Sequence, residues 1–334
     1  SVLVQWQGRH HMEIIVIDNG SNPSLKPQVD GIGKGIVRYY RHTETIPLQC
    51  NWNSAVNVSR GRWVHLLHDD DYVLPGFYTA LEDGLQEAHS GVGAAFTAYE
   101  NLNEHDEVIF RNRLYGAHRG VVDNWVRRIG VTNVLNPPAV VIRRRAYEDV
   151  GGYSDEILYT TDWELYMRVT SRYDWWCEPE VLARYRQHRQ NVTAEQSIAG
   201  AQGEAFWRAI EMSEHYLPAS DRAEIVNRSR RYHFSWALQR LSVPLRAGNV
   251  DGCLRLLREM LRIDRSEESL QDLFEWLGTS LAEPMWPNVM AALTGLSENV
   301  SVPHFARDGE LFDWLRGSRA GEARTELAAQ LAAD

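Results

Sequence analysis

Three consecutive aspartates, Asp69, Asp70 and Asp71, follow the apolar run RWVHLL (62–67) and precede Pro75. The run has the pattern of a buried strand, so we expect the three carboxylates to emerge where that strand ends. Carboxylate oxygens are the ligands that hard divalent cations prefer, which makes the triplet a candidate metal site. The alternative is a helix N-cap cluster, because Asp favours the N-cap and Pro suits the first helical turn. The two interpretations are compatible, since Asp71 can cap the helix while Asp70 binds a metal.

Asp18 and Asn19 form a second candidate pair, at the end of the apolar run EIIVID (13–18). Ligands of open α/β sheets bind at the carboxyl ends of the strands, where we expect this pair to lie. The residues that follow, NGSNP (19–23), are strong turn formers and offer a purely structural explanation. Taken alone, the segment favours the turn.

Asp162 opens the helical pattern DWELYMRV (162–169), and Gly151 and Gly152 precede it. At the start of a helix its carboxylate can project into a cleft, whereas a simple capping role is the alternative. The two glycines permit close approach of the backbone to a ligand.

Basic side chains concentrate in RYRQHRQNVT (184–193), which contains Arg184, Arg186, His188 and Arg189. The chain as a whole carries a formal net charge of −10, which disfavours nucleic acid as its main partner. A local basic cluster in such a chain suits anionic phosphates, and a solvated basic loop is the alternative.

The elements that must position these residues fall into two groups. In the N-terminal part, β-rich runs alternate with helical patterns, which predicts a mostly parallel α/β sheet flanked by helices. The strands expected there are 13–18, 36–42, 62–67, 139–144 and two within 92–110, with helices at 51–61 and 76–90. After about residue 195 only helical periodicity remains, at 200–217, 219–247, 249–263 and 267–278, with one or two more helices in 303–334. We therefore predict an α/β domain over 1–197 and an all-helical domain over 198–334.

Composition limits the class of protein further. A hydrophobic content of 44% is enough for a sizeable core, and no segment approaches the roughly 18 apolar residues that a bilayer-spanning helix needs. Cys50, Cys177 and Cys253 lie far apart, which argues against a disulfide framework and fits a reducing cytoplasm. Lys26 and Lys34 are the only lysines among 35 basic residues, which indicates a GC-rich bacterial genome.

Taken in order, four motifs over about residues 1–195 resemble the family 2 glycosyltransferases, which have the GT-A fold. The motifs are IDNGS, NVSRGRWVHLLHDDDYVLPGFY, GGYSDEILYTTDWELYMR and YRQHRQNVT. The resemblance implies a Rossmann-like GT-A domain and an inverting, metal-dependent transfer of a sugar from a nucleotide diphosphate to an acceptor hydroxyl.

Roles for individual residues follow from the resemblance. Asp162 matches the general base, and Asp70 and His188 match positions that bind Mn²⁺ or Mg²⁺. The resemblance also assigns donor-nucleotide contacts to Asp18, Asn19, Asp69, Arg184 and Arg186, and contacts with the donor or acceptor sugar to Gly151, Gly152, Trp163 and Glu164.

The chain departs from the family pattern at three places. His68 stands where the acidic motif of the family usually begins with Asp. Asn19 replaces the usual second Asp after the strand 13–18, and because Asn both donates and accepts hydrogen bonds, the nucleobase of the donor is not assigned. The family's first strand is missing, and we expect about 20 further residues upstream in the native protein.

Partners and location complete the expectations. We expect a UDP-sugar as donor, and a glycan, a lipid-linked molecule or a small molecule as acceptor, in bacterial polysaccharide or glycoconjugate synthesis. Nucleic acid is not expected, a homo-oligomer could form through the helical domain, and the location is the cytoplasm or the inner face of the membrane. Two alternatives stay open: a non-catalytic module that binds nucleotide sugars, and a nucleotidyltransferase.

Overall fold

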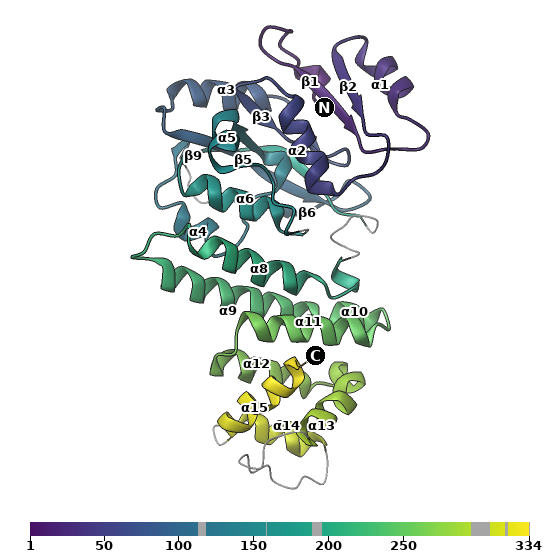
Figure 1. Cartoon of the computed structure of the whole chain (residues 1–334), viewed down its shortest axis with the longest axis vertical. Coiled ribbons are helices and arrows are strands. Elements are labelled where there is room, and N and C mark those ends of the chain that lie inside the picture. Colours follow the sequence, from purple (N-terminus) through teal and green to yellow (C-terminus); the bar gives the residue numbers. More distant parts are fainter. Residues whose placement is uncertain (113–117, 158, 189–195, 295–307, 318–319, 334) are drawn as a thin grey trace. The chain divides into compact units, whose positions relative to one another are not determined.

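The computed structural model describes residues 1–112, 118–157, 159–188, 196–294, 308–317 and 320–333. The chain divides into two compact units, Ser1–Arg189 and Gln190–Asp334 (Figure 1). The first is a mixed α/β unit and the second is helical, so the predicted fold class is confirmed.

The first unit begins with a small parallel sheet of β1 (Ile14–Asp18) and β2 (Val37–Arg41). Helix α1 (Lys26–Gly33) connects the two strands and packs against β2, and α2 (Leu48–Val58) packs against β1 (Figure 1). A parallel pair needs such a crossover, because its two strands run in the same direction.

Among the described residues, a larger sheet of seven strands forms the centre of the unit. Five strands run in the order β3-β8-β5-β9-β4, with β6 paired with β5 and β7 paired with β9. The strands are β3 (Trp63–His65), β4 (Tyr72–Val73), β5 (Val92–Leu102), β6 (Val108–Arg111), β7 (Gly120–Val121), β8 (Val140–Arg143) and β9 (Asp174–Arg186). The remaining elements of the unit are η1 (Leu3–Gln5), α3 (Phe77–Glu87), α4 (Val126–Ile129), η2 (Pro137–Ala139), α5 (Arg144–Val150) and α6 (Thr161–Thr170).

Strand direction is the point on which the prediction needs correction. The sequence predicts a mostly parallel sheet, but among the described pairings of the larger sheet only β5 and β9 are parallel. The physical reason is clearest for β5 and β6, which are joined by residues 103–107 alone. A connection of that length allows a hairpin but no crossover.

Two clusters of buried side chains hold the larger sheet in place. Phe77 and Leu81 of α3 pack with Val92 and Trp176 of the sheet. A second group is aromatic: Trp125 packs on Phe96 with ring centroids 4.9 Å apart and on Trp175 at 5.9 Å. Because β5 is buried along almost its whole length, it provides a rigid base for the residues at its carboxyl end.

In the second unit the described residues form helices and no strands, as predicted. They are α8 (Gln202–Glu214), α9 (Arg222–Arg240), α10 (Ser242–Arg246), α11 (Val250–Ile263), α12 (Glu267–Leu277), η3 (Ser280–Met285), α13 (Trp286–Thr294), α14 (Asp308–Arg316) and α15 (Gly321–Ala332). Its core is apolar and includes Phe234, Leu257, Met260 and Phe274, all fully buried. The described helices include none with the length and apolarity that crossing a bilayer requires.

Candidate active site

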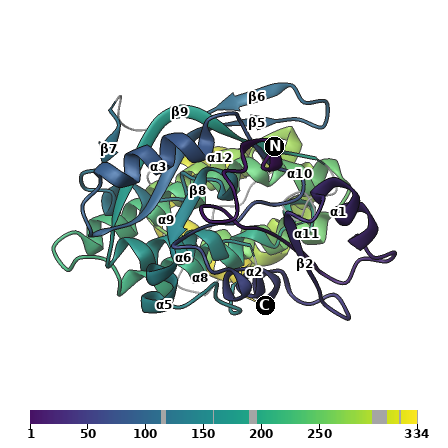
Figure 2. The same ribbon diagram turned by 90° about the horizontal axis from the view of Figure 1, so that it is seen from above.

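The three aspartates lie in the loop between β3 and β4, as the sequence predicts for a strand end. Figure 2 shows the whole chain from above, with β5, β8 and β9 of the larger sheet labelled. The exposure of the aspartates differs: Asp69 is exposed, Asp70 is half-buried, and the Asp71 side chain is fully buried. A tight turn holds the loop, with the Asp71 amide donating to the His68 carbonyl at 3.3 Å. We call residues 68–71 the acidic loop.

The end of β9 lies against the acidic loop, although more than a hundred residues separate them in sequence. The backbone amide of Arg186 donates to Asp71 Oδ1 at 2.9 Å, and its Nε donates to the Asp70 carbonyl at 3.1 Å. His188 Nε2 lies 3.1 Å from Asp70 Oδ2. The structure therefore brings together Asp70 and His188, the two residues predicted to bind metal. Residues 189–193 of the basic motif lie outside the described residues.

The acidic loop offers a donor set that fits a divalent cation. Within the described part of the chain, His68, Asp70 and Asp71 each present one ligand atom, all within 4.8 Å of one another. Asp71 Oδ2 is buried and has no hydrogen-bond partner among the described residues, and the neighbouring His68 Nδ1 is 3.6 Å away. A buried carboxylate oxygen without a partner is costly, and a cation would satisfy it. Carboxylates combined with imidazole suit Mn²⁺ better than Mg²⁺.

Electrostatics agree with that fit. Burial, together with the nearby Asp70 and Asp69, raises the pKa of Asp71 to about 8, while the hydrogen bond from the Arg186 amide opposes the rise. Burial also lowers the pKa of His68, which is stacked on Trp52 with ring centroids 5.0 Å apart. Three neighbouring acids in one loop, of which Asp71 is buried, therefore oppose one another's ionisation, and a bound cation would favour the ionised carboxylates.

Arg184 and Arg186 lie beside the acidic loop on the same face of β9. Both guanidinium groups lie over the ring of Tyr72, at 5.7 and 5.9 Å from its centroid. Arg186 also forms a 2.7 Å ion pair with Asp106. The structure thus places both predicted phosphate-binding arginines next to Asp70.

Asp162 is held at the first turn of α6, where the sequence predicts it. Its Oδ2 accepts a hydrogen bond from Asn133 Nδ2 at 2.9 Å. Burial raises the pKa of Asp162 to about 6, while the Trp163 amide and Asn133 act in the opposite direction. A half-buried carboxylate with this pKa is ionised at neutral pH and is a stronger base than an ordinary Asp. Nothing in the sequence around Asn133 indicated its contact with Asp162.

Asp18 and Asn19 are engaged within their own unit. The buried Asp18 carboxylate accepts from the Ser21 and Leu25 amides at 2.8 and 3.3 Å, and from the Tyr39 hydroxyl. Burial alone would raise the pKa of Asp18, but these hydrogen bonds outweigh it and hold the pKa well below its usual range. Asn19 pairs its side-chain amide with the backbone of Ile46 in both directions, at 2.9 and 3.0 Å. These contacts favour the turn role over the nucleotide role.

Trp163 and Glu164 need correction as sugar contacts. Both are about 1% exposed, Trp163 donates to the Ile129 carbonyl at 2.6 Å, and Glu164 forms a two-pronged ion pair with Arg168. Neither side chain can therefore meet a sugar in this conformation. The sequence places them beside Asp162, but α6 directs them into the core.

Gly151 and Gly152 have a structural explanation. Gly151 has a φ of 85°, and a Cβ on Gly152 would lie 2.2 Å from Asn53 Oδ1. Asn53 instead accepts from the Tyr153 amide at 2.8 Å, and Arg168 donates to the carbonyls of both glycines. The glycine pair is therefore needed for close packing within the unit, whether or not a ligand approaches.

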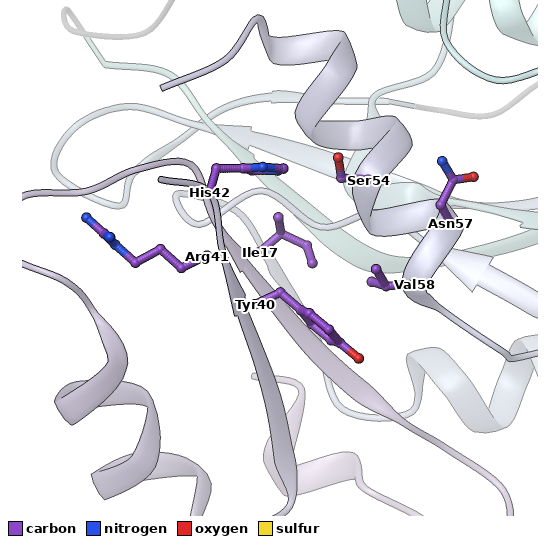
Figure 3. Close-up of a pocket in the computed structure, with 7 residues that line it drawn as sticks. All are labelled: Ile17, Tyr40, Arg41, His42, Ser54, Asn57 and Val58. Atoms are coloured by element: carbon purple, nitrogen blue, oxygen red, sulfur yellow. The ribbon is translucent and has the colours of Figure 1, made fainter. Parts of the chain in front are cut away.

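A cavity of about 300 Å³ lies among β1, β2 and α2 (Figure 3). It is lined by Ile17, Tyr40, Arg41, His42, Ser54, Asn57 and Val58. None of the predicted site residues contributes to its walls, so it does not define the site.

Comparison with known proteins supports a relationship to the glycosyltransferases. Residues 1–151 match the model of glycosyl transferase family 2, so the predicted recognition of that family is confirmed for the N-terminal part of the chain. An uncharacterized protein of Mycobacterium tuberculosis (strain CDC 1551 / Oshkosh), MT1568, is 24% identical over 181 residues. The match covers 48% of this chain and 53% of that protein, so the chain spans about half the length of this relative.

Solved structures of Staphylococcus aureus TarS share the fold. The chain matches TarS 1–349 with a TM-score of 0.57 and 13% identity, covering 90% of this chain and 87% of that one. The same values hold for TarS 1–349 in complex with UDP. The longer TarS structure matches with a TM-score of 0.52, at 97% of this chain and 48% of that one. Family and fold together support a glycosyltransferase.

Proposed function

We propose that this protein is an inverting, metal-dependent glycosyltransferase that moves a sugar from a nucleotide diphosphate, expected to be UDP, to an acceptor hydroxyl. The observation that carries the proposal is the meeting of the acidic loop with the end of β9, which gathers carboxylates, an imidazole and two arginines. That combination suits a cation together with a diphosphate. The UDP complex of the structurally similar TarS supports the choice of nucleotide.

The donor side is assigned to the acidic loop and β9. Asp70 and His188 would hold Mn²⁺ or Mg²⁺, and His68 and Asp71 offer further ligand atoms. When bound, the ion supplies Lewis-acid stabilisation of the negative charge that develops on the leaving diphosphate. Arg184 and Arg186 add fixed positive charge beside it.

The acceptor side is assigned to Asp162. Its Oδ atoms receive the proton of the acceptor hydroxyl as that oxygen attacks the anomeric carbon. Asn133 fixes the orientation of the carboxylate through the 2.9 Å hydrogen bond. Attack from the face opposite the leaving diphosphate inverts the configuration in one step.

The acceptor and the role of the helical unit are assigned only by class. We propose a glycan, a lipid-linked molecule or a small molecule as acceptor, recognised with the help of the helical unit, which could also support a homo-oligomer. The proposed location is the cytoplasm of a bacterium, at or near the inner face of the membrane.

Release of nucleotide from nucleotide sugars tests the function. A thermal-shift screen with Mn²⁺ identifies the donor, because a ligand that binds the folded state raises its melting temperature. With that donor we expect Mn²⁺-dependent release of free nucleotide. Asp162→Asn should abolish release while UDP still binds, and Asp174→Asn, an exposed position, is the matched control. Full turnover by the Asp162→Asn variant would contradict the mechanism, and UDP binding without any release by the unaltered protein would indicate a non-catalytic binding module.

A further inference from the structure

Glu100 is a buried acid that the sequence motifs do not include. It lies near the carboxyl end of β5 and is 3% exposed. In the register of the sheet its Cα partners are Arg111 on β6 and Arg184 on β9, and Arg184 is in turn the partner of Tyr72 on β4. These four residues form one row across four strands, which we call the Glu100 row.

Each carboxylate oxygen of Glu100 accepts hydrogen bonds from a different arginine. Oε1 accepts from Arg111 Nε and Nη2 at 2.9 and 2.5 Å, and Oε2 accepts from Arg184 Nε at 2.9 Å. Burial would raise the pKa of Glu100, but the hydrogen bonds from Arg111 and Arg184 outweigh it and keep the pKa below its ordinary value. The carboxylate is therefore charged at neutral pH, and both of its oxygens are fixed.

Arg184 is fixed from two sides as a result. Arg184 Nε donates a hydrogen bond to Glu100 Oε2, and Arg184 Nη1 donates one to the hydroxyl of Tyr72 at 3.2 Å. The Nη2 group has no hydrogen bond to another described residue. Since the row contains two arginines and one glutamate, a net positive charge stays beside the acidic loop, where the diphosphate is proposed to bind. A guanidinium held in place loses less conformational entropy when it binds a phosphate.

We propose that Glu100 is a positioning residue, which orients Arg184 toward the diphosphate of the donor, with Arg111 locking the other carboxylate oxygen. The inference rests on the proposed function and goes beyond it, because it names a residue that does not touch the donor yet sets its affinity. A purely structural ion pair would stabilise the fold without any preference for a phosphate-bearing ligand.

Titration calorimetry with UDP and with uridine separates the two roles, because uridine lacks the phosphates that Arg184 would bind. In the presence of Mn²⁺ we expect Glu100→Gln to weaken UDP binding about tenfold, the effect of losing one charge-assisted hydrogen bond, and to leave uridine binding unchanged. Glu104→Gln, at an exposed position of the same hairpin, is the matched control and should leave both affinities unchanged.

A double-mutant cycle tests whether Glu100 acts through Arg184. If it does, Glu100→Gln should have no further effect on UDP affinity once Arg184→Gln is in place, whereas independent roles would add. Arg111 is well exposed, so Arg111→Gln is expected to fold and serves as a second test if Glu100→Gln does not. Because it frees one carboxylate oxygen of Glu100, we expect it to weaken UDP binding about threefold.

Each outcome decides the question. The positioning role is supported if Glu100→Gln lowers the affinity for UDP but not for uridine, and if this loss disappears when Arg184→Gln is also present. Equal losses for UDP and uridine, additive effects, or an unchanged UDP affinity in Glu100→Gln or Arg111→Gln would overturn it. If the unaltered protein does not bind UDP at all, the proposed function fails as well, so the two failures are distinguishable.

Discussion

Two strand-end loops of the α/β unit carry acids in similar sequence settings but differ in how the structure uses them. After β1, the Asp18 carboxylate is surrounded by hydrogen-bond donors of its own loop, and Asn19 pairs with the backbone of Ile46. After β3, Asp69 is exposed, and Asp71 has a buried oxygen that finds no partner in the part of the chain that the structure describes.

The difference shows what separates a structural acid from a candidate ligand. A carboxylate that is satisfied by backbone amides stabilises a turn, and binding another group would require breaking those bonds. A carboxylate that has one oxygen without a partner and lies close to other acids gains most from a cation. The two loops differ in how many hydrogen-bond donors the fold supplies to their carboxylates. Residue type and position after a strand do not distinguish them.

The largest expected effect is on the β3 side of the comparison. Asp70→Asn should lower metal-dependent nucleotide release by about a thousandfold, because a metal ion supplies several kcal/mol of charge stabilisation. Its melting temperature should stay close to that of the unaltered protein, since Asp70 is only half-buried. Steady-state rates and a thermal melt check both statements, and a variant that keeps full activity would remove Asp70 from the site.

The reverse pattern is expected on the β1 side. Asp18→Asn should destabilise the protein by about 2 kcal/mol, because it removes a charged acceptor that several donors share. The pKa of Asp18 is depressed in the folded state, so its contribution is present above the unfolded pKa and is lost as pH falls through the folded pKa. Denaturant unfolding at neutral and acidic pH measures this, and the variant should approach the unaltered protein at low pH. Loss of UDP binding without loss of stability would instead support the nucleotide role.

The pH dependence of the reaction tests Asp162. Because the base acts when ionised and its pKa is raised to about 6, kcat/KM should fall about tenfold per pH unit below that value. The raised pKa also affects folding. The folded state binds this proton more tightly than the unfolded state does, so the contribution of Asp162 to the free energy of unfolding declines as pH rises from the unfolded pKa through the folded pKa of about 6. A profile that is flat from pH 5 to 8 would exclude Asp162 as the base.

The smallest effect is expected for Asn133→Ala. The hydrogen bond from Asn133 opposes the rise in the pKa of Asp162, so its loss should move the acidic limb of the profile to higher pH. The loss of orientation should also reduce kcat several-fold, as expected for about 1 kcal/mol. An unchanged limb would show that Asn133 does not act through Asp162. Thr132→Ala, next to it in the chain, is the control.

Much of the architecture was predictable, because hydrophobic periodicity reports which faces are buried. The α/β unit followed by helices, the strand end at the acidic loop, and the helix that Asp162 opens were all expected. Strand direction was not, since it depends on which strands pair across the sheet. The burial of Trp163 and Glu164 also escaped prediction, because the orientation of α6 is set by tertiary packing.

The partners of the site residues were the least predictable part. Glu100 interrupts the apolar stretch VGAAFTAYENL, and a charged residue inside a buried strand was a signal that could have singled it out. His68 likewise occupied a position at which the family pattern has an acid. The contact of Asn133 with Asp162 joins segments that are separate in sequence, and no local pattern indicates it.

The central claim is that the acidic loop, and not the loop after β1, couples a divalent cation to the nucleotide. Titration of UDP with and without Mn²⁺ tests it most directly, in the unaltered protein, Asp70→Asn and Asp18→Asn. We predict that Mn²⁺ raises UDP affinity about tenfold or more in the unaltered protein and in Asp18→Asn, and that Asp70→Asn loses this increase. A UDP affinity independent of Mn²⁺, or an increase that survives Asp70→Asn and disappears in folded Asp18→Asn, would contradict the account.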